Sequence, residues 1–173
     1  MTEAERELCH QLVIHADGKV DISEEEFKRR FPSAICHGKL AKALLEEAFQ
    51  SQNGDDLLCV MIIGSTFGFG PEHIDILCRL IDATWHQCHE FVVSALDGLR
   101  TTEAVDALFR ATQWVPEYLD YDESRALAVK AIWGLGNLVD RKSEDKLKTL
   151  VHSEDAILRK AAVEQLKRRA EAT

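Results

Sequence analysis

Two stretches near the end of the chain carry the clearest sign of its fold: Ser124-Arg125-Ala126-Leu127-Ala128-Val129-Lys130-Ala131-Ile132-Trp133-Gly134-Leu135 and Asp155-Ala156-Ile157-Leu158-Arg159-Lys160-Ala161-Ala162-Val163-Glu164-Gln165-Leu166. When the arginines are aligned, Ala128 coincides with Ala162, and a valine follows in both, at an interval of 34 residues. A small residue lets two helices approach closely, and the apolar neighbour fills the groove between them. The two stretches therefore predict equivalent helices of a repeat.

The same pattern extends toward the N-terminus. Segments 57–64 and 89–96 align with the two stretches, at steps of 32 and 36 residues. Between these helices lie shorter segments with a leucine-centred apolar stripe, which we expect to be second helices, at 72–81, 102–112 and 143–151. A single helix pair cannot bury both of its faces, so successive pairs must stack.

This arrangement resembles the HEAT-repeat family, and in particular its short bacterial form. The two quoted stretches are similar to the family's pattern of an acidic cap, an arginine, paired alanines and a leucine, and the resemblance covers roughly residues 55–170. It implies an all-α fold, a right-handed α-solenoid of helix pairs. The first repeat departs from the pattern, because Leu57 replaces the arginine and three glycines (Gly64, Gly68 and Gly70) interrupt its helix end.

Residues 1–52 match no repeat, and we expect them to form an N-terminal helical cap on the repeats of residues 53–173, in one compact domain overall. Apolar spacing predicts helices over 3–15 and 38–51, separated by a turn at Asp17-Gly18 and a short helix that ends near Arg30. Ser23 followed by Glu26 forms the capping-box pattern that begins this short helix.

Composition narrows the class of protein. The chain has 173 residues, 46% of them hydrophobic and 29% charged, with no apolar run of the roughly 18 residues that a membrane span needs. Its start, Met1-Thr2-Glu3-Ala4-Glu5, lacks the apolar core of a signal peptide. The five cysteines are odd in number, contain no Cys-x-x-Cys pair and mostly lie within apolar runs, which indicates buried, reduced thiols in a cytoplasmic protein. We expect no membrane binding.

Charge is unevenly distributed along the sequence. The formal net charge is -9, which argues against binding to nucleic acid, because phosphate contacts need a basic face. Residues 57–122 carry 3 basic and 10 acidic side chains, whereas residues 123–173 carry 11 basic and 8 acidic ones. The acidic middle favours a basic partner protein and fast encounter with it, although an acidic run can also serve only solvation.

Known enzymes related to HEAT repeats do not fit these residues. Deoxyhypusine hydroxylase holds two irons with several His-Glu pairs, whereas this chain has one, His89-Glu90. DNA glycosylases of this type line a face with lysine and arginine, whereas the middle of this chain holds only Arg79, Arg100 and Arg110 against ten acids. Bilin lyases gain no specific support. We therefore expect a protein that is not an enzyme and that needs no cofactor.

Three other patterns have simpler explanations than a ligand site. His86, Cys88 and His89 are weak candidates for zinc, because His86 and His89 would share a face of a helix, but two ligands are too few for a site. Residues 17–24 resemble the second half of a calcium loop whose first half is missing. Residues 64–71 are rich in glycine but lack the lysine of a phosphate loop, and we expect Phe67 and Phe69 to pack there.

The most informative segment is Trp114-Val115-Pro116-Glu117-Tyr118-Leu119-Asp120-Tyr121-Asp122-Glu123. It lengthens a connection within the repeats and holds both tyrosines of the chain. Aromatic side chains dominate binding hot spots, and acids pair with lysine or arginine. The candidate partner-binding residues are Trp114, Glu117, Tyr118, Asp120, Tyr121, Asp122 and Glu123. Alternatively, the large apolar side chains fold inward and the acids are only solvated.

These observations lead to a functional hypothesis with alternatives. The chain is predicted to be a non-catalytic module that binds a basic protein, and one specific form of this hypothesis is an immunity protein that neutralises a toxin domain. One alternative is a HEAT-like enzyme or enzyme subunit, either lyase-like or metal-dependent. Another is a self-associating assembly protein that uses its acidic middle and basic end.

Overall fold

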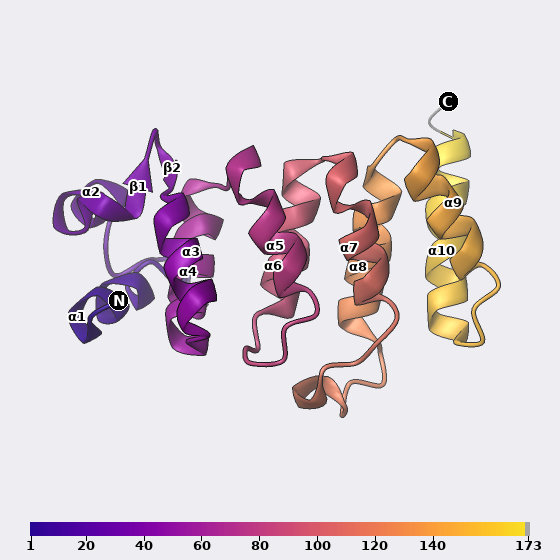
Figure 1. Cartoon of the computed structure of the whole chain (residues 1–173), viewed down its shortest axis with the longest axis horizontal. Helices are drawn as coiled ribbons and strands as arrows, with labels where there is room; N and C mark the ends of the chain where they lie inside the picture. The colour runs from indigo at the N-terminus through magenta and orange to yellow at the C-terminus, as the bar shows by residue number, and fades with distance from the viewer. Residues whose placement is uncertain (172–173) are drawn as a thin grey trace. The chain divides into compact units, whose positions relative to one another are not determined.

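The computed structural model describes residues 1–171, in which almost all of the regular secondary structure is helical (Figure 1). The all-α prediction is confirmed. The chain divides into two compact units, one of residues 1–76 with 85–88 and the other of residues 77–84 with 89–173. The predicted boundary between residues 52 and 53 does not coincide with this division, because α4 (Gly54–Phe67) packs against helices α1 (Glu3–His10) and α3 (Lys42–Ser51) of the first unit. Within the described part of the chain, every helix is too short or too polar to cross a membrane.

The first unit is organised around α4. This helix is apolar on nearly all sides: Leu57 and the six consecutive residues from Cys59 to Gly64 are buried, and Leu58 is half-buried. Gly64 allows the ring of Phe69 to lie against the helix, where a Cβ atom would collide with it. Phe67 stacks on Phe27 of α2 (Glu24–Arg30), with ring centroids 5.5 Å apart. The predicted packing of both phenylalanines is therefore confirmed.

Two helices of the first unit begin at capping side chains, of which Ser23 was predicted. Ser23 accepts a hydrogen bond from the backbone N–H of Glu26, and Asn53 does the same for Asp56. Each side chain satisfies an N–H that has no partner within its helix. Gln52, in the left-handed conformation, separates α3 from α4, directly after the predicted helix end at residue 51.

Two predicted helices are shorter than the sequence suggests. Helix α1 ends at His10, and residues 11–22 form a projecting turn around Gly18. Helix α3 begins at Lys42, because residues 35–40 form a small hairpin of β1 (Ile35–Cys36) and β2 (Lys39–Leu40). Its turn has positive φ at His37 and Gly38, which suits a two-residue hairpin connection.

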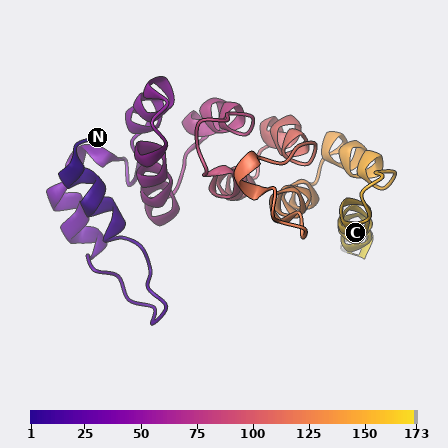
Figure 2. The same ribbon diagram turned by 90° about the horizontal axis from the view of Figure 1, so that it is seen from below.

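The second unit contains two rows of helices, visible end-on in Figure 2. One row contains α6 (His89–Leu99), α8 (Ala126–Asn137) and α10 (Ala156–Glu171), and the other contains α7 (Val105–Ala111) and α9 (Arg141–Leu150). Helix α8 packs against all four of the others. Helix α5 (Ile74–Leu80) crosses the division between the two units, after a 3-10 turn at Pro71–His73.

Small residues allow α8 to approach its neighbours, as the repeat pattern predicts. Ala128 and Ala162 are buried, and a Cβ atom on Gly134 would meet the methyl groups of Leu108 at 3.3 Å. The prediction for the neighbouring valine is wrong at α10, because Val163 is 50% exposed. Among the described residues no later helix packs on that side of α10, so the side chain has no groove to fill.

The cysteines are all free thiols in the described structure. Cys9, Cys59 and Cys88 are buried, Cys78 is half-buried and Cys36 is exposed. The thiols of Cys9 and Cys59 hydrogen-bond to each other between α1 and α4, which raises the pKa of Cys9 and lowers that of Cys59. The interpretation of these cysteines as mainly buried thiols therefore holds for three of the five.

The basic C-terminal end of α10 contacts α8 as well as the solvent. Arg169 donates hydrogen bonds to the backbone oxygens of Leu135, Gly136 and Leu138 and to the hydroxyl of Ser143. These carbonyls belong to the C-terminal end of α8, where a cation is favourable. Arg168 instead lies over the ring of Trp133 and donates one hydrogen bond to Asn137.

Replacing Arg169 with alanine should lower the free energy of unfolding by about 2 kcal/mol, because several partly buried acceptors lose a charged donor together. Arg168→Ala removes the same charge from the same helix turn and should cost well under half as much. Urea denaturation of both variants measures the difference. Equal losses would show that net charge, not capping of α8, explains the role of these arginines.

Candidate partner-binding site

The candidate site lies on the connection between α7 and α8, which contains a single 3-10 turn at Glu117–Leu119. Pro116 and Leu119 are buried, so the connection rests on the second unit rather than standing away from it. The turn is closed by a backbone hydrogen bond of 2.8 Å from Leu119 to the carbonyl of Pro116. This backbone support gives the exposed side chains of the connection a defined position.

His89, the first residue of α6, holds the connection in place. Its side chain is buried, with 1% of its surface exposed. Its ring makes a T-shaped contact with the ring of Trp114, with centroids 5.3 Å apart, and stacks on the ring of Tyr118, with centroids 5.6 Å apart. Its Nε2 atom lies 2.9 Å from the carbonyl oxygen of Ala83, and its Nδ1 atom lies 3.0 Å from the hydroxyl of Tyr118. Because a carbonyl only accepts, Nε2 carries the proton, and Nδ1 of the neutral ring accepts from Tyr118.

Burial lowers the pKa of His89, and this effect outweighs the opposing effects of the Ala83 carbonyl and the charge of Asp82. A buried imidazolium loses its hydration, so the neutral ring is favoured. Trp114 and Tyr118 therefore contact a neutral, aromatic surface at neutral pH.

Asp122 fixes the other end of the connection, at the start of α8. Its carboxylate accepts hydrogen bonds from the backbone N–H groups of Ser124 and Ala126, at 3.0 and 2.6 Å, and from the hydroxyl of Ser124. The Ser124 hydroxyl and these backbone donors lower the pKa of Asp122, with a further contribution from Arg125. Arg125 itself adopts the left-handed conformation at the N-cap position. Asp122 therefore acts mainly on the local backbone.

The remaining four candidates point outward. Glu117, Asp120, Tyr121 and Glu123 are exposed, and Tyr121 is 81% exposed. Within residues 1–171, no salt bridge involves the three acids. The structure thus divides the seven predicted residues into three that anchor the connection (Trp114, Tyr118 and Asp122) and four that it presents. We call these four the presented quartet.

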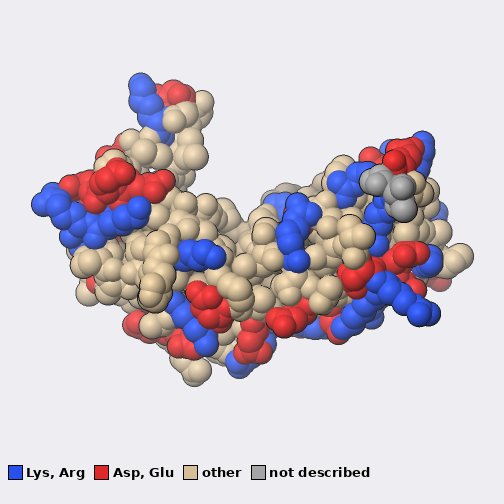
Figure 3. All heavy atoms as spheres, turned by 90° about the horizontal axis from the view of Figure 1, so that it is seen from above, with Lys and Arg blue, Asp and Glu red and all other residues tan. Residues whose placement is uncertain are grey.

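Most other acids in the middle of the sequence are paired. Lys130 lies 2.9 Å from Glu90, Lys142 and Lys146 both reach Asp106, and Arg110 lies 2.6 Å from Asp82. The lysines of the basic C-terminal segment therefore compensate acids of the middle segment across neighbouring helices. The face drawn in Figure 3 likewise carries basic and acidic side chains beside one another. In the second unit, three acids without an ion pair are thus grouped on the connection, whereas others, such as Glu103, Glu154 and Glu164, stand singly elsewhere.

The weak metal candidates do not form a shared site. The prediction that His86 and His89 occupy one helix face is wrong, because α6 begins only at His89. Nδ1 of His86 accepts a hydrogen bond of 3.0 Å from the backbone of Cys88. In the described part of the chain, no group of three or more His, Cys, Asp or Glu side chains is arranged to hold a metal ion.

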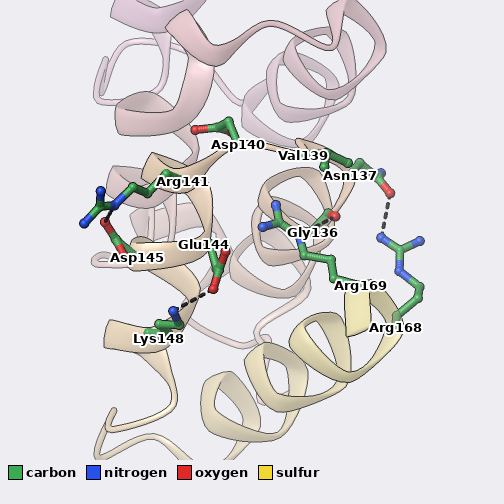
Figure 4. A pocket seen from close by; sticks show the side chains of 10 residues that line it. All are labelled: Gly136, Asn137, Val139, Asp140, Arg141, Glu144, Asp145, Lys148, Arg168 and Arg169. Carbon is green, nitrogen blue, oxygen red and sulfur yellow. Dashed lines mark hydrogen bonds and ion pairs between the residues drawn. The ribbon is translucent and has the colours of Figure 1, made fainter. Parts of the chain in front are cut away.

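The second unit also contains an open pocket of about 820 Å³, where the end of α8 meets α9 and α10 (Figure 4). Charged groups in its lining are directed at one another: Lys148 lies 2.6 Å from Glu144, and Arg141 lies 4.0 Å from Asp145. Arg169 is engaged with the backbone of α8. The pocket lining contains no histidine, cysteine or serine.

Comparisons with known proteins found no match for this chain among protein-family models, curated proteins or solved structures. The functional argument therefore depends on the residues and their geometry.

Asp122→Ala should lower the urea midpoint of unfolding, because the first turn of α8 loses its side-chain acceptor. Asp120→Ala, on the same connection but exposed, should leave the midpoint unchanged. Since the pKa of Asp122 is lowered by folding, its contribution is present above the unfolded pKa of about 3.9 and is lost as the pH falls through the lower folded pKa. The two midpoints should therefore converge with wild type in strong acid, and a difference that persists there contradicts the capping role.

Proposed function

We propose that this chain is a non-catalytic protein-binding module, and that its presented quartet binds a basic region of a partner protein. The scaffold of the proposal is a right-handed α-solenoid of HEAT-like helix pairs, preceded by an N-terminal helical cap. Support for the scaffold comes from the two helix rows of the second unit and from the small residues at which α8 meets its neighbours. The observation that carries the binding proposal is the 81% exposure of Tyr121 among three unpaired acids on an anchored connection.

The chemistry of the quartet defines the partner. Tyr121 offers a large ring with few rotatable bonds, which loses little entropy when it enters an apolar pocket. The carboxylates of Glu117, Asp120 and Glu123 lie on the same short connection and would face lysine or arginine around that pocket. Since Trp114 and Tyr118 already hold the backbone, the partner need not order the whole connection.

A specific form of the proposal is an immunity protein that neutralises a toxin domain in the cytoplasm. Its support is limited to the small size of the chain, its net charge of -9 and the acids gathered around an exposed aromatic residue. A basic toxin domain has the surface charge that the quartet requires. A toxin domain encoded beside this protein is the first partner to test.

Tyr121→Ala should weaken capture of the partner by about 30-fold, the loss expected for an interface hot spot of 2 kcal/mol. The triple variant Glu117→Gln/Asp120→Asn/Glu123→Gln should slow association and reduce its dependence on salt. Affinity capture at moderate salt, followed by binding kinetics with the purified partner, measures both effects.

The matched control is Glu103→Gln/Glu154→Gln/Glu164→Gln, which removes three negative charges from exposed acids elsewhere in the second unit. It should retain wild-type binding. If the control and the quartet variant lose the partner equally, only the net charge of the protein matters. If Tyr121→Ala retains full affinity, the connection is not the binding site.

A further inference from the structure

His89 joins the rigid part of the second unit to the candidate binding site. Its Nε2 atom donates a hydrogen bond to the carbonyl oxygen of Ala83. Its Nδ1 atom accepts one from the Tyr118 hydroxyl, and its ring contacts the rings of Tyr118 and Trp114, which both belong to the connection. With 1% of its surface exposed, the ring has no access to water. The docked position of the connection therefore requires a ring that tolerates complete burial.

We infer that His89 is a pH-sensitive latch: its neutral ring holds residues 114–123 in the docked position, and protonation releases them. The control of partner binding by this latch rests on the proposed function, whereas the latch itself does not. In the docked state, a proton on Nδ1 would bury a charge away from water and force the Tyr118 hydroxyl to turn and accept. Undocking would return the charged ring to water.

The surrounding charges offset this cost only in part. Asp82, on the connection before α6, is the acid whose field favours the imidazolium, but Arg110 of α7 lies 2.6 Å from its carboxylate. On α6 itself the next residue is Glu90, and Lys130 of α8 neutralises it at 2.9 Å. The binding connection contributes a neutral phenol. Asp82 and Glu90 thus each have a cation, whereas the acids of the connection itself, Glu117, Asp120 and Glu123, are exposed to water.

The direction of the pH dependence follows from linkage. Folding lowers the pKa of His89 through burial. A ring released to water has an ordinary pKa of about 6.5, so it takes up a proton at a pH where the docked ring does not. The docked state is therefore favoured fully above about pH 6.5 and progressively less as the pH falls toward the lower docked value.

The test uses the whole chain labelled with 5-fluorotryptophan, in which Trp114→Phe identifies the Trp114 resonance. Between pH 7.5 and 4.5 this resonance should move toward its position in urea, with a midpoint below 6.5, while far-UV circular dichroism stays constant. His89→Phe keeps a ring but no titratable group, so the Trp114 resonance should stay at its docked position throughout. His152→Phe, which replaces an exposed histidine of the same unit, should titrate like wild type.

A second measurement does not depend on how well His89→Phe folds. In wild type labelled with ¹⁵N-histidine, the imidazole of His89 and the Trp114 resonance should titrate with one midpoint. Different midpoints, an unmoving Trp114 resonance, or equal titration in His89→Phe would each overturn the latch.

Binding to a purified partner separates the latch from the proposed function. If both hold, acidification from pH 7.5 to 5.5 weakens binding by wild type and not by His89→Phe. If the Trp114 resonance titrates but no partner is found whose binding depends on Tyr121, the latch is supported and the proposed function is overturned.

Discussion

Close approach of α8 to its neighbours is the constraint on which the second unit depends. Two glycines and several alanines on this helix leave room for the side chains of α6, α7 and α10, and Gly136 lies directly against the buried side chain of Gln165. A helix so closely surrounded cannot shift without opening several contacts at once. The connection that enters α8 through Asp122 therefore begins from a fixed point, and Arg169 secures the opposite end of the same helix.

Ion pairing between neighbouring helices then decides where negative charge remains. Lysines on α8 and α9 reach back to acids on α6 and α7, so each of these two helices compensates the preceding helix of its own row. Such exposed pairs contribute little stability individually, at most about 1 kcal/mol. Their larger consequence is for recognition, because they leave Glu117, Asp120 and Glu123 as acids without an ion-pair partner beside an exposed aromatic ring. A partner that reads charge would therefore find a localised target.

Sequence patterns could predict the helices because periodicity and capping are local properties. Ser23 and Asn53 begin helices through contacts only three residues away. The hairpin at residues 35–40 was not predicted, because strands of two residues are too short to show a periodic pattern. The one residue in it that indicated a turn was Gly38. For the candidate site, composition identified the segment, but it did not show which side chains anchor the connection and which are presented. Whether Tyr118 or Tyr121 packs inward depends on His89, which lies 29 residues earlier in the sequence.

The separation of anchoring from presented residues is what makes the connection a credible binding surface. An extended loop would pay an ordering cost when it binds, whereas a fully packed one would offer no side chains. Here two aromatic residues and one carboxylate hold the backbone, while the presented quartet remains accessible. Because the aromatic anchors meet on a single buried imidazole, the order of the whole connection is coupled to the protonation of one side chain. A site held by apolar contacts alone would lack that dependence. His89 therefore both positions the binding surface and makes its position depend on protonation.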